Sequence, residues 1–459
     1  MEIRPLRGSA VAAAAALAAC AGSPQAYDDL RRDYDRLPYP EAADAPPASD
    51  PFAGAEALER APLVEAVLER NPSIEAARQA WIQATEEVPA ERSLSDPMLQ
   101  YSIAPLSAID DDARFGHSVR LSQRLPWPGV RGARGDVAVA RAEALQGDYL
   151  SARLELALAA ATLYDEYYRV ARELEINETH IELLADAQAG ARAEFEAGRA
   201  TLQDPLQAEV EASHLEHRRL ALRGEHDEIV ARLNALLHRD HRTPLPPAPE
   251  ARDIPEPIAA PAEALIALAL AERTELDSAE AEIRAGEAAL DLAGAEDRPQ
   301  FGVSAMYDSM WPGLSHQIMV GLEMSLPIWR ERRRGDRDAA RAQRERARAE
   351  HDHLATEIAA DVVALHRRAT ETLHVVVHYQ NEIIPAAEDR AEAAHAAFVA
   401  GDLSFNALVD ALTRLRDQEL EYEQHLAELY TRRAALARSV GRVPGELDDI
   451  AGGAIQEAP

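Results

Sequence analysis

The stretch Phe195-Glu196-Ala197-Gly198 occurs again, little changed, as Phe398-Val399-Ala400-Gly401. The two glycines are 401 − 198 = 203 positions apart. The run Leu125-Pro126-Trp127 returns as Leu326-Pro327-Ile328-Trp329, with its leucines 326 − 125 = 201 positions apart. Landmarks that recur in the same order at nearly constant spacing indicate an internal duplication. A period of about 200 residues is far longer than a solenoid repeat, so a whole structural half is duplicated.

Each half is predicted to contain the same series of elements: an opening helix, a β-hairpin, a very long helix, a tight turn and a returning helix. We place the first half at 56–246 and the second at 247–445, followed by a tail at 446–459. The expected bounds in the two halves are 62–92 and 262–295 for the opening helix, 97–126 and 299–327 for the hairpin, 133–196 and 336–397 for the long helix, and 203–238 and 405–440 for the returning helix.

The returning helices carry a seven-residue apolar repeat, which is typical of coiled coils. The repeat comprises Leu215, Leu222, Ile229 and Leu236 in the first half, and Leu408, Leu415, Tyr422, Leu429 and Leu436 in the second. At about 1.5 Å per residue, a returning helix and an opening helix together match the long helix in length. We therefore expect each returning helix to stack end to end on the opening helix of the other half.

The segments between the helices alternate in polarity. Leu99, Tyr101 and Ile103 alternate with polar or small residues, and Ile318 to Leu326 repeats the pattern. About ten residues of such alternation predict strands that face lipid on one side and a wet lumen on the other. Soluble hairpins packed on helices are the alternative. Four strands are too few to close a barrel, so several chains would have to combine their strands.

Composition excludes several functions. Eighty acidic and 48 basic residues give a net charge of −32, which disfavours binding to nucleic acid. The sequence contains no phosphate-binding glycine loop, zinc-protease motif or nucleophile elbow, so we expect neither an enzyme nor a bound cofactor. The single cysteine, Cys20, rules out an intramolecular disulfide.

The N-terminus has the features of a secretory signal. Arg4 and Arg7 precede a short apolar run that ends in Leu17-Ala18-Ala19-Cys20. This ending resembles the lipobox of bacterial lipoproteins, which implies cleavage after residue 19 and lipidation of Cys20. We therefore expect a lipoprotein signal peptide at 1–19 and a lipid-anchored extended linker at 20–55, rich in Pro, Ala and Asp.

Taken together, the duplicated layout resembles the TolC family of outer-membrane efflux proteins. The residues that carry the resemblance are Phe195-x-x-Gly198, Phe398-x-x-Gly401, Leu125-Pro126-Trp127-Pro128-Gly129 and Leu326-Pro327-Ile328-Trp329. The run from Pro126 to Arg131 is most similar to the branch that serves heavy-metal exporters.

The resemblance implies a mainly α fold: helical coiled-coil hairpins that form a periplasmic tunnel, and four membrane strands per chain in a trimeric 12-stranded barrel. It implies a lipid-anchored protein of the Gram-negative outer membrane that exports passively, here heavy-metal cations, together with a periplasmic adaptor and an inner-membrane pump. The alternatives are a multidrug or other small-molecule channel of the same family, and a periplasmic coiled-coil lipoprotein spacer without a pore.

The resemblance also points to particular residues. Asp410, with Asp402 nearby, matches the acidic aperture at the periplasmic end, although Ala407 replaces a second acid of the family. Gly198, Leu202, Gly401 and Leu403 lie at the two tips, where the adaptor is expected to bind. For Asp410 the alternative is a solvated helix face, and for the tip leucines it is packing within the hairpin.

Two further features concern the membrane boundary. Trp127 and Trp329 are predicted to be interfacial aromatics just past the strand ends. Basic clusters follow each hairpin, beginning at Arg131 and at Arg330, and could contact lipid headgroups or simply begin a charged helix. The two clusters are expected to occupy equivalent places beside the membrane.

Overall fold

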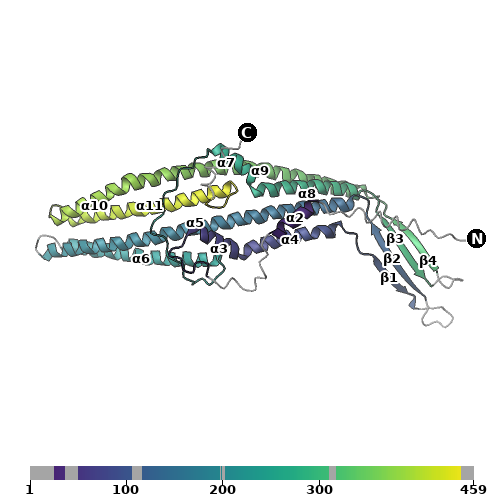
Figure 1. Ribbon diagram of the computed structural model, residues 1–459, viewed down its shortest axis with the longest axis horizontal. Coiled ribbons are helices and arrows are strands. Elements are labelled where there is room, and N and C mark those ends of the chain that lie inside the picture. Colours follow the sequence, from purple (N-terminus) through teal and green to yellow (C-terminus); the bar gives the residue numbers. More distant parts are fainter. Residues whose placement is uncertain are drawn as a thin grey trace, which may run out of the picture. The chain divides into compact units, whose positions relative to one another are not determined.

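The computed structural model describes residues 25–36, 50–105, 116–196, 198, 202–309 and 317–445. Over these residues the two halves repeat one order of elements (Figure 1). The helices are α2 (Gln25–Arg36), α3 (Arg60–Arg70), α4 (Pro72–Arg92), α5 (Val130–Glu196), α6 (Gln203–Leu236), α7 (Ala262–Glu272), α8 (Thr274–Glu296), α9 (Arg330–His378), the π-helix η2 (Tyr379–Ile383), α10 (Ile384–Val399) and α11 (Phe405–Ser439). The strands are β1 (Met98–Ile103), β2 (His117–Leu125), β3 (Phe301–Asp308) and β4 (Gln317–Met324).

The chain divides into two compact units. The sheet unit comprises the described residues within 25–36, 77–149 and 275–353, and it contains the strands. The tip unit comprises the described residues within 50–76, 150–274 and 354–445, and it contains the turns of both long hairpins.

The strands fall within the two segments where alternation predicts them. They form one antiparallel sheet in the order β1-β2-β3-β4, so the two duplicated hairpins join through β2 and β3 (Figure 1). Leu99, Leu121, Ala305 and Val320 lie directly opposite one another in a single row across the sheet. Val320 is 83% exposed, and Leu99 and Leu121 are exposed as well. The sheet therefore has one continuous apolar face that this chain does not cover.

The opposite face is polar but more charged than the alternation predicts. Ser122, Ser304 and Gly321 share one row, as the pattern suggests, and the neighbouring rows add Arg120 and Arg124. Gln123 is a polar residue on the apolar face of β2, and its side-chain amide donates to the carbonyl of Ser95 at 2.7 Å. This bond gives Gln123 a structural partner at the sheet's end.

The second long helix is interrupted where the first is continuous. α5 runs unbroken for 67 residues, whereas α9 and α10 are separated by η2. Pro385 lacks an amide hydrogen and cannot continue the α-helical ladder, and the Ile384 amide bonds instead to the carbonyl of Tyr379, five residues back. A π turn holds one residue more than an α turn. This extra residue explains why the spacing between the halves is 202 at the tryptophans and 203 at the tip glycines.

The single opening helices expected at 62–92 and 262–295 were wrong, because each is two helices. In the first half the break is at Asn71, which is extended with ψ 120° because Pro72 follows it. In the second half Arg273 takes nearly the same backbone conformation, with ψ 117°, and its side chain is buried.

Each returning helix meets the opening helices of its own half, so the expected exchange between halves was wrong. The Asn71 side chain donates to the carbonyl of Leu236 at the end of α6 with a distance of 3.0 Å. In the second half, Arg442 pairs with Glu272 at 2.6 Å just beyond α11. The break residue Asn71 thus satisfies a backbone carbonyl at the end of α6.

The extended linker predicted at 20–55 was wrong at 25–36, which form α2. Tyr27 and Leu30 are buried one helical turn apart. Tyr34 lies edge-on to Trp81 with ring centroids 6.3 Å apart and donates to Glu86 of α4. The apolar side chains of this segment are spaced so that they lie on one helix face. Their burial stabilises a helix although the segment is polar in composition.

The predicted coiled-coil positions form the core of the tip unit. Leu222 and Ile229 of α6 are buried against Tyr164 and Tyr167 of α5. On α11, Leu408, Leu415, Leu429 and Leu436 are buried. The heptad pattern therefore identifies the packed faces of both returning helices.

A close approach in the sheet unit gives a stability prediction. A Cβ added to Gly286 of α8 would lie 2.9 Å from the Arg344 Cα of α9, whereas one added to Gly294, also on α8, has no atom within 4 Å. Gly286→Ala is expected to destabilise by about 1–3 kcal/mol through overpacking. Gly294→Ala is expected to stabilise by up to about 1 kcal/mol through helix propensity. Denaturant unfolding of the two variants tests this, and shifts of the same sign would contradict it.

Candidate functional site

The two hairpin turns of the tip unit use glycine in the same conformation. Gly198 and Gly401 have φ of 72° and 80°, which other residues adopt only with strain. At the second turn the Asp402 amide donates to Ala397 and the Gly401 amide to Phe398, the pattern of a Schellman cap. The glycines therefore reverse the chain at both predicted tips.

Behind the turns, the two hairpins pack on each other through a shared apolar cluster. α5 contributes Leu184, Ala187 and Ala191, and α11 contributes Phe405, Leu408 and Val409. The Phe398 ring lies 5.8 Å from that of Phe405, and it approaches Gly190 so closely that an added Cβ there would be 3.2 Å away. The repeated phenylalanine of the sequence thus joins the second tip to the first hairpin.

The two tips differ in what they expose. On α6, Leu206 and Val210 continue one turn apart from Leu202, and all three are exposed. On the second tip, Leu408 is fully buried and Leu403 is half-buried. The first tip therefore presents an apolar stripe, whereas the second uses its leucines internally.

Asp410 is half-exposed on the first turns of α11 and is paired. Its carboxylate accepts from Arg390 of α10 at 2.6 Å, and Arg414 lies 3.9 Å away. Asp402 is exposed just past the turn. Within one chain these acids do not form a cluster, and the charge of Asp410 is compensated by arginine.

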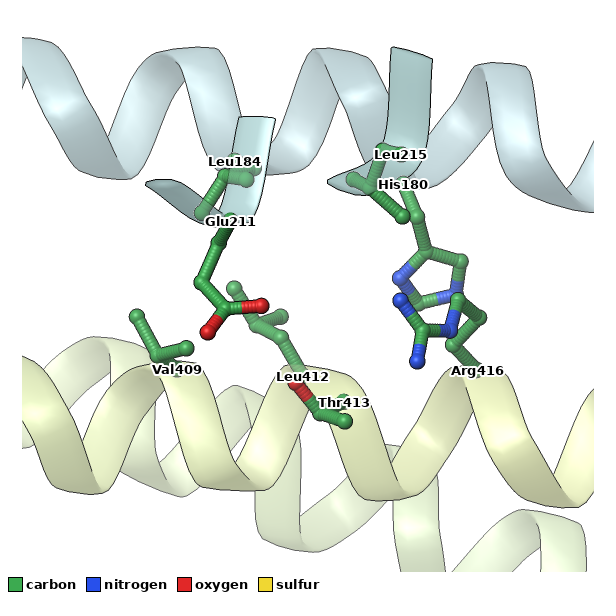
Figure 2. A pocket seen from close by; sticks show the side chains of 8 residues that line it. All are labelled: His180, Leu184, Glu211, Leu215, Val409, Leu412, Thr413 and Arg416. Atoms are coloured by element: carbon green, nitrogen blue, oxygen red, sulfur yellow. The ribbon is translucent and has the colours of Figure 1, made fainter. Parts of the chain in front are cut away.

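Further from the tips, polar pairs connect α5 to α11. His180 Nε2 lies 2.7 Å from Glu419, and Arg172 donates to Glu423 at 3.2 Å. Next to the first pair is a cavity of about 20 Å³, enough for one water molecule. Figure 2 shows His180 and Glu211 reaching from the first hairpin toward α11, which presents Arg416. The cavity is too small for a transported molecule.

Glu423 provides a pH prediction. Burial raises its pKa, and Arg172 opposes the shift. The folded state then binds a proton more readily than the unfolded state, so falling pH favours folding through this group. As pH falls from neutral toward the ordinary range of a glutamate pKa, the Tm of the wild type is expected to rise relative to that of Glu423→Gln. The exposed control Glu357→Gln is expected to follow the wild type, and parallel profiles for all three proteins would contradict the assignment.

A buried ion cluster, which sequence reasoning missed, joins both halves at the middle of the tip unit. Asp165 of α5 accepts from Arg60 of α3 at 2.8 Å and from Arg252 at 2.9 Å. Arg252 lies in the linker between α6 and α7, with its guanidinium carbon 3.4 Å from the ring centroid of Tyr430 on α11. Three tyrosines surround Asp165 in the sequence, which makes this segment of α5 unusual. Nothing in the segment predicts the arginine partners of Asp165, because they are distant in the sequence.

In the sheet unit the two duplicated tryptophans have different surroundings. Trp127 is half-buried, stacked on Phe301 with centroids 5.8 Å apart, and Arg298 lies over its ring. Trp329 is 73% exposed beside exposed Leu326 and Ile328. The second tryptophan is thus more accessible to a surrounding medium than the first.

No group of three or more histidine, cysteine or acidic side chains with metal-binding geometry occurs among the described residues. His374 and His378 are exposed one turn apart on α9, and the latter lies 3.5 Å from Glu382. None of the described helices is both long enough and apolar enough to cross a membrane. Cys20 and the signal segment lie outside the described residues.

Comparison with known families matches the chain to a profile described as "Outer membrane efflux protein". It covers residues 63–238 and 265–442, one copy on each predicted half. Among curated proteins, none matches this sequence.

Solved structures with the same architecture include three outer-membrane channels. CusC, described in terms of transmembrane channel formation, has a TM-score of 0.73 at 14% identity, covering 83% of this chain and 92% of its own. VceC of Vibrio cholerae has 0.69 at 15%, covering 83% and 96%. The CmeC outer membrane channel of Campylobacter jejuni has 0.72 at 13%, covering 83% and 85%. At these identities the likeness establishes the fold alone.

Proposed function

Because the chain belongs to the outer membrane efflux protein family, we propose that it is the outer-membrane channel of a tripartite export system. In this role it is a passive conduit rather than an enzyme. The single observation that carries the proposal is the four-stranded sheet, which exposes an apolar face and leaves β1 and β4 as outer strands. Such a sheet is stable in lipid only when its edges are paired.

Further copies of the chain are the natural partners for these edges. The strands alternate in direction, so β4 of one copy can pair antiparallel with β1 of the next. Three copies would provide twelve strands, within the range of closed membrane barrels. We therefore propose a homotrimer, lipid-anchored at Cys20 in the outer membrane of a Gram-negative bacterium. A coiled-coil spacer would not require the apolar sheet face.

The tips are the proposed contact with the periplasmic adaptor and, through it, with an inner-membrane pump. The exposed stripe of Leu202, Leu206 and Val210 makes the first tip the better apolar surface, while Gly198 and Gly401 set the shape of both turns. Leu403 is half-buried and contributes less surface. A contiguous group of exposed apolar side chains is typical of a protein contact surface.

Single-channel current across a planar bilayer tests the pore and its aperture together. We propose that Asp410 and Asp402, which lies just past the turn, line the closed end, where the ion pair of Asp410 with Arg390 holds α10 and α11 together. The purified protein is expected to give small discrete steps. Asp410→Ala is expected to increase open probability severalfold because it releases that pair.

The matched control is Asp389→Ala, which removes an exposed acid from α10. It is expected to behave as the wild type. Equal currents from both variants would remove Asp410 from the aperture, and failure of the folded protein to insert into lipid would refute the channel.

We further propose heavy-metal cations as the exported substrate. The resemblance of residues 126–131 to the heavy-metal branch supports this substrate. Loss of the gene is then expected to raise sensitivity to cobalt, zinc, cadmium or copper. Sensitivity to drug-like compounds alone would instead indicate a multidrug channel of the same family.

A further inference from the structure

We propose that the junction between β4 and α9 is a binding site for an anionic phospholipid, and that the duplicated junction in the first half is not. The site consists of Leu326, Ile328 and Trp329, which would contact an acyl chain, and Arg330 and Arg332, which would bind the phosphate. The inference rests on the proposed outer-membrane location and goes beyond it by assigning a lipid class to one position.

The apolar part of the site continues the exposed face of the sheet. Ile318, Val320 and Leu322 are strongly exposed along β4, and Leu326, Ile328 and Trp329 extend this surface past the end of the strand. At the junction, residues 328–332 line an open surface pocket of about 510 Å³. An apolar wall that begins at a lipid-facing strand and ends at a tryptophan has the arrangement expected at a headgroup boundary.

The polar part of the site has uncommitted positive charge. Arg330 is exposed, and the side chains of Arg332 and of the neighbouring Arg334 are 82% and 75% exposed. Their contacts with Asp336 and Asp338, one turn further along α9, are 3.9 and 3.7 Å long, and exposed pairs of this kind contribute little. Guanidinium groups match phosphate oxygens in geometry and charge. A lipid phosphate would therefore compete successfully for these arginines.

At the spacing of 202 residues that separates the two tryptophans, Arg330 and Arg332 correspond to Pro128 and Val130. The arginines that the first half does have are already used within the chain. Arg131 donates to the backbone carbonyl of Arg92 at 2.7 Å, and Arg134 pairs with Glu296 at 2.7 Å. Trp127 is covered by Phe301 and Arg298. The first junction thus lacks counterparts of the two exposed arginines and has a partly covered tryptophan, whereas the second junction has both groups that a lipid needs.

Charge complementarity selects an anionic lipid over a neutral one. Between residues 330 and 337 the chain places five arginines against two acids, although the whole protein carries −32. Each basic side chain near a membrane surface favours anionic lipid. A second copy of this chain could instead cover the site, and the experiment below distinguishes this copy from a lipid.

Fluorescence quenching by brominated lipids tests the proposal. The full-length protein is reconstituted into vesicles of phosphatidylethanolamine and phosphatidylglycerol, with bromine on one lipid or the other at equal mole fraction. The difference between the wild type and Trp329→Phe isolates the Trp329 signal. Phosphatidylglycerol is expected to be enriched about fivefold at Trp329, the amount that a single surface arginine contributes.

Two double variants that lose the same amount of charge serve as the test and its control. Arg330→Gln with Arg332→Gln is expected to abolish the enrichment. Arg341→Gln with Arg346→Gln, which alters exposed arginines further along α9, is expected to preserve it. Equal quenching by both lipids would overturn the proposal, as would enrichment that survives the first variant. Absence of quenching would mean that another copy covers Trp329, which also overturns it.

Vesicle flotation of the Cys20→Ala variant, which has no lipid anchor, separates this failure from failure of the proposed function. Protein that inserts into the vesicles but shows no lipid preference refutes only the lipid site. Protein that does not insert refutes the membrane channel itself.

Discussion

Asp165→Ala is expected to lower the free energy of unfolding by about 3–5 kcal/mol, because it leaves two buried arginines without their shared anion. The side chains of Arg60 and Arg252 are only 17% and 9% exposed, and both donate to this carboxylate. Without Asp165 their like charges would repel each other in a poorly hydrated site. Burial already lowers the pKa of Arg60, so the site resists positive charge.

The effect is expected to be large because the cluster connects four separate segments. Arg60 also donates to the carbonyl of Tyr430, and Thr431 donates to Asp165 at 3.3 Å. The guanidinium of Arg252 lies over the ring of Tyr164, at 5.2 Å from its centroid, as well as over Tyr430. Cation–π contacts of a desolvated arginine add to the ion pairs. Loss of the anion thus weakens α3, α5, the linker and α11 together.

The measurement is urea unfolding followed by circular dichroism at fixed protein concentration, since assembly affects apparent stability. Asp186→Ala is the matched control, because it makes the same change at an exposed position of the same helix. It is expected to change stability by less than about 0.5 kcal/mol. Similar losses in both variants would show that Asp165 is not a special site.

The architecture could be predicted because it depends on features that recur. The tip glycines, the strand exits and the heptads each occur twice, and each has a local physical cause: positive φ, period-two alternation or a coiled-coil face. The break at Asn71 was also predictable, because a proline follows it. The break at Arg273 was not, because no residue there disfavours a helix.

The details of the candidate sites could not be predicted, because they depend on partners distant in the sequence. Asp165 finds Arg252 and Arg60 only after the linker folds back. Which arginines after each hairpin are paired within the chain is known only from the positions of Arg92, Glu296 and Asp297. Asp410 likewise gains its Arg390 partner through the turn of the hairpin. Sequence identifies these residues as charged, and the fold decides which charges remain available.

Val320→Arg is expected to prevent stable membrane assembly, because it places a charge on the exposed apolar face of β4. Val320 is 83% exposed and lies in the row that contains Ala305, Leu121 and Leu99. An arginine on the lipid side of a membrane strand costs about 2–4 kcal/mol at mid-depth. In an assembly of several identical chains this cost is repeated in every copy.

The adjacent residue provides the control, because successive side chains point to opposite faces of a strand. Met319→Arg alters the face that already carries Arg120 and Arg124, so the assembly is expected to tolerate it. The yield of heat-resistant oligomer in the membrane fraction measures both variants. Equal yields would mean that lipid does not contact the apolar face, and the sheet would then pack against protein. A loss of oligomer in Val320→Arg alone would instead establish that the apolar face meets the membrane. Arg120 and Arg124, on the opposite face, would then line the interior.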